Sequence, residues 1–258
     1  MLTTIVVLVG FGCLSGLTTV LFGFGGGFVT VPVVYAVAAS GPQVGSQAMH
    51  LAVGTSTAVM VVNAAGGTLA QYRSGRLRRD YVWPLAGYVA VGAGLGALAA
   101  TAAPDGLLHV LFAVYLGITI VDSVVRRGFL RGGVPRPLGA RTASLGGVTI
   151  GAVASFLGVG GSVMTVPLLR RRGLPMAQAV AMANPLSLPV AVVATAVYLT
   201  VPAPDGSLGV DLLAGALLLA GSLPTIAVAR RLLPHVPDRV HAVAYVGLLG
   251  VALVAVLV

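Results

Sequence analysis

Charge is what this 258-residue chain has least of: 8% of its residues are charged, and lysine and glutamate are absent. Soluble domains carry about 25% charged residues, so the composition excludes an ordinary soluble protein. The single cysteine, Cys13, also excludes an internal disulfide. With 57% hydrophobic residues and a mean hydropathy of +1.02, the chain is predicted to be an integral membrane protein.

Ionisable side chains are missing from the middle of the predicted membrane spans. No arginine lies within a span, and Asp122 sits about one turn from a cytoplasmic end, so a carboxylate proton relay, a metal cluster or a Ser/His/Asp triad cannot be assembled at the midplane. We therefore expect no enzyme activity, no metal and no cofactor. His50, His109 and His241 each begin a helix, where a solvated imidazole is expected. Asp80 and Asp122 are expected to be local partners of nearby arginines.

Ten hydrophobic segments are present, and their continuous apolar runs predict helices rather than the alternating strands of an outer-membrane barrel. The fold class is therefore an all-α polytopic membrane protein. The second segment of each half is too short to cross a ~30 Å hydrocarbon core and is predicted to be a half-helix. The first-half segments are 2–22, 27–39, 48–72, 81–101 and 107–125, and the second-half segments are 142–157, 162–169, 177–200, 209–229 and 240–258.

The 15 arginines all fall on one side if the chain changes side at every segment. By the positive-inside rule this side is cytoplasmic, with both termini outside. The basic charge is thus an orientation signal, and we expect the partner to be a lipid bilayer and not nucleic acid. The arginine-bearing loops contain Arg73, Arg76, Arg78 and Arg79; Arg126, Arg127, Arg131, Arg136 and Arg141; Arg170, Arg171 and Arg172; and Arg230, Arg231 and Arg239.

Five segments in each half is an odd number, so the halves enter the membrane in opposite orientations. This predicts an inverted repeat about a pseudo-two-fold axis in the membrane plane. The expected organisation is a first transmembrane repeat over 1–125, a cytoplasmic basic connector over 126–141 and a second transmembrane repeat over 142–258.

A glycine-rich decamer at Gly23–Pro32, GFGGGFVTVP, returns 135 positions later at Gly158–Pro167 as GVGGSVMTVP. Paired Gly-interrupted segments in two halves point to the binding site of a transporter, although glycines also serve close helix packing. The N–H groups at two such half-helix starts would supply partial positive charge to a small anionic substrate. The residues concerned are Gly25, Gly26, Gly27, Gly160, Gly161 and Ser162.

Uncharged hydrogen-bonding side chains stand near the start of the third segment of each half. Thr55 and Ser56 in the first copy and Asn184 in the second are the candidate substrate-binding residues. Serine and threonine in membrane helices also commonly bond to their own backbone or to a neighbouring helix. Pro185 and Pro189 predict a broken helix start in the second copy. Secondary candidates are Thr57, Ser187 and Asn63.

The doubled glycine motif, followed in the first half by Ala-Val-Gly-Thr-Ser and then by Tyr72 and Gly75, resembles the sulfite exporter TauE/SafE family. The resemblance implies a polytopic carrier in the bacterial inner membrane for small sulfur-containing anions such as sulfite or organosulfonates. The second copy departs from the pattern at Ser162 and over 183–185. The matching positions are Gly23, Gly25, Gly26, Gly27, Pro32, Gly54, Thr55, Ser56, Gly158, Gly160, Gly161 and Pro167.

The leading hypothesis is a secondary transporter, an exporter working by alternating access, with the anion held at the half-helix starts between the repeats. The alternative is a non-transporting membrane subunit or assembly factor whose glycines serve packing. A channel and an embedded enzyme are further alternatives. The sequence predicts no oligomeric state.

Overall fold

The computed structural model describes residues 2–39, 47–83, 85–125, 135–201, 209–232 and 237–257, and all regular structure in these ranges is helical. The predicted all-α fold is therefore confirmed. Residues 126–134 of the predicted connector, and Arg126, Arg127 and Arg131 with them, lie outside the described residues.

The helices begin and end within a few residues of the predicted segments. The fourth segment is divided in two, because Trp83, which precedes a proline in the sequence, is extended and ends a short helix. The first half contains α1 (Leu2–Phe22), α2 (Gly27–Ala39), α3 (Ala48–Arg73), α4 (Arg79–Val82), α5 (Leu85–Thr101) and α6 (Asp105–Val125). The second half contains η1 (Thr142–Gly146, a π-helix), α7 (Gly147–Leu157), α8 (Ser162–Arg171), α9 (Met176–Thr200), α10 (Leu212–Leu232) and α11 (Asp238–Leu257).

Within the described ranges, six helical segments are long and apolar enough to cross a membrane. The short α2 and α8 have 13 and 10 residues. At 1.5 Å per residue they extend about 20 and 15 Å, which is well short of a ~30 Å core. Each is preceded by a glycine turn, as the two glycine motifs predict.

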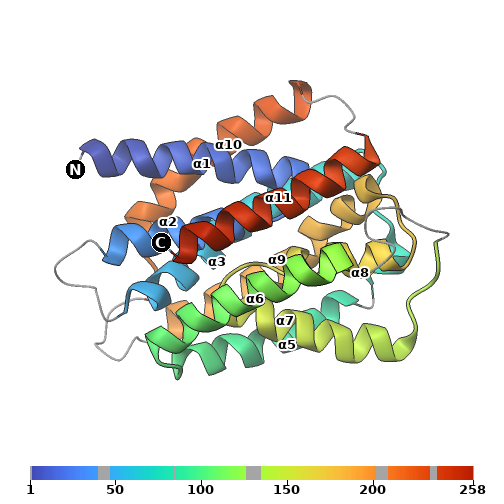
Figure 1. Ribbon diagram of the computed structural model, residues 1–258, viewed down its shortest axis with the longest axis horizontal. Coiled ribbons are helices and arrows are strands. Elements are labelled where there is room, and N and C mark those ends of the chain that lie inside the picture. Colours follow the sequence, from blue (N-terminus) through green and yellow to red (C-terminus); the bar gives the residue numbers. More distant parts are fainter. Residues whose placement is uncertain are drawn as a thin grey trace.

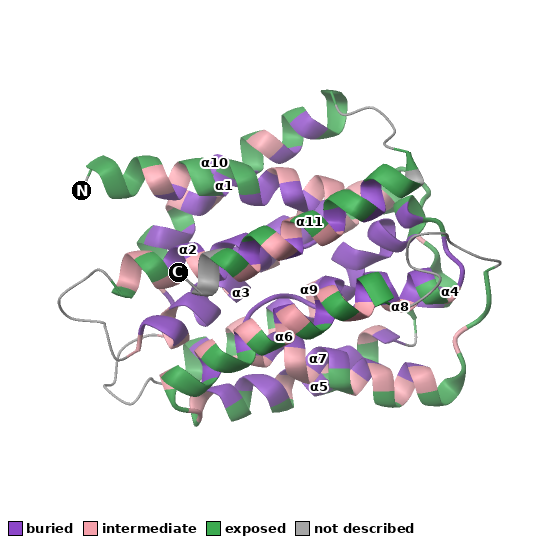
Figure 2. Ribbon diagram, in the orientation of Figure 1, coloured by how far each residue is buried: buried purple, intermediate pink, exposed green. Residues whose placement is uncertain are grey.

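The most buried spans are α3 and α9, which pack against each other in the middle of the molecule (Figures 1 and 2). Around them, α1 packs along α10, and α5 packs along α7 (Figure 1). Both outer pairs approach closely through glycine: a Cβ added to Gly16 would lie 2.5 Å from Ser222 O, and one added to Gly151 would clash with Val89 O. The packing role of small residues in membrane helices therefore holds for these glycines.

The broken helix start predicted from Pro185 and Pro189, in the third segment of the second half, is wrong. Residues Met176–Thr200 form one continuous helix with Pro185 and Pro189 inside it. Two prolines four residues apart remove few backbone hydrogen bonds, and a buried membrane helix tolerates the loss when its neighbouring turns and packed partners hold it.

Two histidines also differ from expectation. His50 has a side chain only 12% exposed and an Nδ1 atom 2.9 Å from Asp105 Oδ1, while His241 is buried with Nε2 against Leu21 O. Neither is a solvated imidazole. Their positions between helices, rather than at free helix ends, account for the difference.

The expected local pairing of acidic residues with arginines is confirmed. Asp80 pairs with Arg78 and thereby raises the pKa of that exposed guanidinium, and Asp122 pairs with Arg171.

Candidate functional site

The first glycine motif forms a tight turn between α1 and α2. Gly23, Gly25 and Gly26 have φ values of +71°, +63° and +92°, a region that only glycine occupies without strain. A Cβ on Gly23 would lie 2.5 Å from Ala183 Cβ and 2.9 Å from Val180 O. The turn is therefore pressed against α9 of the other half.

The second motif forms a similar turn between α7 and α8. Gly158 and Gly160 have φ values of +68° and +69°, which match Gly23 and Gly25. The third matched glycine differs, because Gly161 has a φ of −65° where Gly26 is positive. The two turns thus share their first two backbone bends but not the third.

The two turns lie side by side, and side chains of α3 pack against both. A Cβ on Gly27 would lie 2.9 Å from Gly158 O. Ser56 Oγ lies within hydrogen-bonding distance of both turns, 3.1 Å from Gly27 O and 2.7 Å from Gly158 O. Met60 packs against Gly25 on one side and Gly160 on the other. The two turns are therefore in direct contact, with Ser56 and Met60 of α3 packed against both.

Several backbone N–H groups at the turns are left without an acceptor. Those of Gly25, Gly26 and Gly27, and those of Gly160 and Gly161, make no hydrogen bond to any other described residue. Such groups at a helix start attract anions.

At the second turn one predicted N–H group already has an acceptor, because Ser162 N donates to Ser187 Oγ at 3.1 Å. The predicted free N–H groups are thus retained at the first turn and only partly at the second.

Thr55 and Asn184 lie away from the turns. Thr55 Oγ1 accepts a hydrogen bond of 2.8 Å from Asp211 N, at the beginning of α10. Asn184 packs against Gly67 of α3, where a Cβ would clash with its Nδ2 atom. In the described part of the chain, neither side chain makes a hydrogen bond to a glycine turn.

Two further side chains face the first turn: Asn63, a secondary candidate from the sequence, and Ser15, which the sequence analysis did not select. A Cβ on Gly26 would overlap Ser15 Oγ and lie 2.8 Å from Asn63 Nδ2. Both residues are fully buried, and neither atom has a hydrogen-bond partner among the described residues. Asn63 is held by Ser222 of α10, whose Oγ donates to Asn63 Oδ1 at 2.9 Å. We call Ser15, Asn63 and Ser222 the polar cluster.

A basic pocket of about 430 Å³ opens near this cluster, between α1, α3, α9, α10 and α11. Exposed Arg76 and Arg230 contribute to its wall, and Asn184 lies on its buried side. Arg76 and Arg230 belong to two of the arginine-bearing regions of the sequence, so the pocket lies on the side where those two regions meet. The remaining lining residues are Thr19, Val20, Leu21, Gly67, Ala70, Gln71, Ser74, Ala177, Val180, Ala229 and His241.

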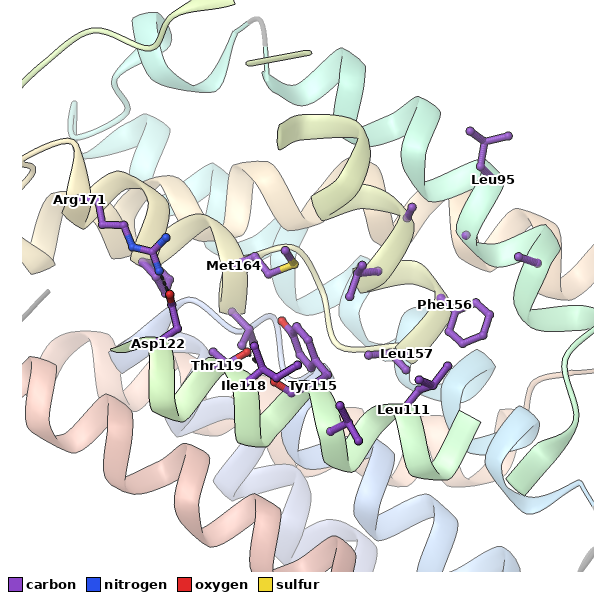
Figure 3. A pocket seen from close by; sticks show the side chains of 17 residues that line it. Leu95, Leu111, Tyr115, Ile118, Thr119, Asp122, Phe156, Leu157, Met164 and Arg171 are labelled. Carbon is purple, nitrogen blue, oxygen red and sulfur yellow. Dashed lines mark hydrogen bonds and ion pairs between the residues drawn. The ribbon is translucent and has the colours of Figure 1, made fainter. Parts of the chain in front are cut away.

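A larger groove of about 730 Å³ runs between α5, α6, α7 and α8 (Figure 3). Apolar side chains such as Leu95, Ile118 and Phe156 line it, and Arg171 at one end is already paired with Asp122. Leu95 and Ile118 are more than half exposed, so the groove faces outward. Apolar walls and a neutralised arginine make it unsuitable for a small anion.

Comparisons with known proteins extend over most of the chain. The sequence model of the sulfite exporter TauE/SafE family matches residues 8–256. A curated relative from Haemophilus influenzae, described as "Probable membrane transporter protein", is 28% identical over 183 residues, which cover 70% of this chain and 68% of the relative. No solved structure matches the chain.

Proposed function

The chain belongs to the sulfite exporter TauE/SafE family, and from this premise we propose that it is a secondary exporter of small sulfur-containing anions working by alternating access. Its membership and its apolar helices make it a multi-pass membrane transporter. The sulfur class of the substrate comes from the family description, and the mechanism comes from the arrangement of the two turns.

The observation that carries the proposal is the meeting of two half-helix starts in the interior. Gly25, Gly26 and Gly27 present N–H groups without acceptors beside the second turn, and Ser56 contacts both turns. Each helix start contributes on the order of 0.3–2 kcal/mol to binding a negative charge. Such a site binds weakly and releases its ion, as export requires.

The packing of the halves supports alternating access. The pairing of α1 with α10 is the counterpart of the pairing of α7 with α5, and α3 pairs with α9 at the centre. Both termini lie at the same end of the helices in Figure 1, as the predicted change of side at every segment requires. We propose that the halves form an inverted repeat, with the arginine-rich loops in the cytoplasm of a bacterial inner membrane and both termini outside.

The other predicted residues take roles at the edges of this site. We propose that Asn184 lines the path from the cytoplasm through the basic pocket. Thr55 holds the beginning of α10 through Asp211 and closes the opposite side. Gly160, Gly161 and Ser162 form the second half-helix start beside this site, and the N–H of Ser162 is taken up by the hydroxyl of Ser187.

Transport is tested by efflux of sulfite from sealed proteoliposomes, with sulfate and chloride as comparison anions. We expect sulfite efflux from vesicles containing the protein, and slower efflux with Ser56→Ala because this hydroxyl joins the two turns. The matched control is Thr57→Ala, since Thr57 Oγ1 bonds only within its own helix, to Gly54 O at 2.8 Å. Efflux no faster than from protein-free vesicles would favour a non-transporting subunit.

A further inference from the structure

We propose that the anion is bound at the first turn alone, by the polar cluster together with the N–H groups of Gly26 and Gly27, and that it arrives through the basic pocket. This inference rests on the proposed anion transport and assigns its binding residues. Where the two turns meet, it places the anion on the side of the first turn, in a one-sided site built mainly from the first half and α10.

The first step is the chemistry around Gly26. Ser15 Oγ and Asn63 Nδ2 both face this glycine, are fully buried and have no partner among the described residues. Buried hydrogen-bonding groups left unpaired are destabilising and rare in folded proteins. Two such groups that converge on one helix start indicate a ligand that accepts hydrogen bonds. A small oxyanion has several acceptor oxygens and a charge that the helix start favours.

The second step is the contrast with the other turn. The side chains that face the matched Gly161 are apolar: a Cβ there would lie 3.4 Å from Ile150 Cγ2 and 3.6 Å from Val190 Cγ2. Ile150 stands 135 positions after Ser15, the same offset as the two motifs. Both Ile150 and Val190 belong to a separate buried apolar cluster. An anion beside Gly161 would therefore gain no donor from Ile150 or Val190. The donors near the second turn are the buried hydroxyls of Ser162 and Thr165 on α8 itself, which have no partner among the described residues.

The third step is access. Thr19 and Gly67 line the basic pocket, and each lies one helical turn from a member of the polar cluster, Ser15 on α1 and Asn63 on α3. One turn is about 5.4 Å, so the cluster lies directly beyond the inner wall. Arg230 at the rim follows Ser222 by eight residues on α10, which is about two helical turns.

The pocket has the capacity and the charge for this role. A water molecule takes about 30 Å³ of liquid, so about 430 Å³ accommodates a small oxyanion with part of its hydration shell. No acidic residue lines the pocket among the described residues, while Arg76 and Arg230 raise the local anion concentration at its rim.

The test is thermal stabilisation of the purified protein by sulfite, selenite, sulfate and chloride, titrated against the wild type and three variants. Asn63→Asp keeps an oxygen that accepts from Ser222 and removes the free Nδ2 donor, and its carboxyl group repels an anion when it is ionised. We expect it to weaken sulfite binding more than about tenfold, and Ser15→Ala to weaken it several-fold, since hydrogen bonds to charged groups are the strong ones.

The matched control is Ser187→Ala, which removes the corresponding hydroxyl contact at the second turn. It should leave the affinity for sulfite within about twofold of the wild type, because no ligand contact is lost there. Stabilisation of the wild type that persists unchanged in Asn63→Asp, or that is lost in Ser187→Ala alone, overturns the one-sided site while leaving anion transport standing. No stabilisation of the wild type by any of the four anions overturns the assigned site, and sulfite efflux from the proteoliposomes then decides whether the proposed transport stands.

Discussion

The first and second glycine turns have nearly the same backbone and very different surroundings. Gly23 and Gly25 bend as Gly158 and Gly160 do. Around the third matched glycine, however, the first turn meets Ser15 and Asn63 and the second meets Ile150 and Val190. The comparison teaches that the repeated motif specifies a chain turn at the half-helix starts. Binding chemistry depends on the helices packed against each turn.

The largest loss of stability is expected at glycines whose backbone conformation the two turns share. Gly23→Ala and Gly158→Ala force alanine into the left-handed region, at about 1–2 kcal/mol, and also place a Cβ within 3 Å of backbone atoms of Val180 or Val53. Overpacking adds about 1–3 kcal/mol. Unfolding titrations in mixed micelles should show both variants destabilised by about 2–5 kcal/mol.

The control for this pair is Gly75→Ala, since Gly75 has a φ of +68° but nothing within 4 Å of a Cβ. Gly75→Ala should lower the free energy of unfolding only by the cost of the left-handed conformation, about 1–2 kcal/mol. If Gly158→Ala is no less stable than Gly75→Ala, the second turn is not held against α3 in the way described.

An intermediate effect is expected at the second turn only. Ser187→Ala leaves the buried N–H of Ser162 without its acceptor and should lower the free energy of unfolding by about 1–3 kcal/mol. The same unfolding titration measures it. If Ser187→Ala is as stable as the wild type, the Ser187 hydroxyl does not hold the Ser162 N–H. That N–H would then be free for a ligand, like those of the first turn.

The smallest effect on stability, and one of opposite sign, is expected at the first turn. Ser15→Ala removes a buried hydroxyl that has no partner among the described residues. The free energy of unfolding of the ligand-free protein should therefore stay the same or rise by up to about 1 kcal/mol. Destabilisation by 2 kcal/mol or more, measured without anion, would indicate that Ser15 has a structural role instead.

Much of this architecture can be predicted from the sequence. Hydropathy and segment length are local properties, so the membrane helices, the two short helices and the glycine turns all appear close to their predicted positions. The continuous helix through Pro185 and Pro189 could not be predicted, because its tolerance of proline depends on the neighbours that support it.

The candidate site is harder to predict than the fold. Ser15, Asn63 and Ser222 lie on three helices far apart in the chain, and only the crossing of α1, α3 and α10 brings them together. A serine in an apolar helix commonly bonds to its own backbone, so nothing in the local sequence distinguishes Ser15. Thr55 stands out in the motif, yet its hydroxyl is used to hold Asp211.

The most direct measurement is a crystal structure of the protein with selenite, a heavier analogue of sulfite whose selenium can be located by anomalous scattering. We expect one anomalous peak inside the protein, beside Gly26 and within hydrogen-bonding distance of Ser15 or Asn63. A peak beside Gly161, or one shared equally by the two turns at Ser56, would contradict the one-sided anion site.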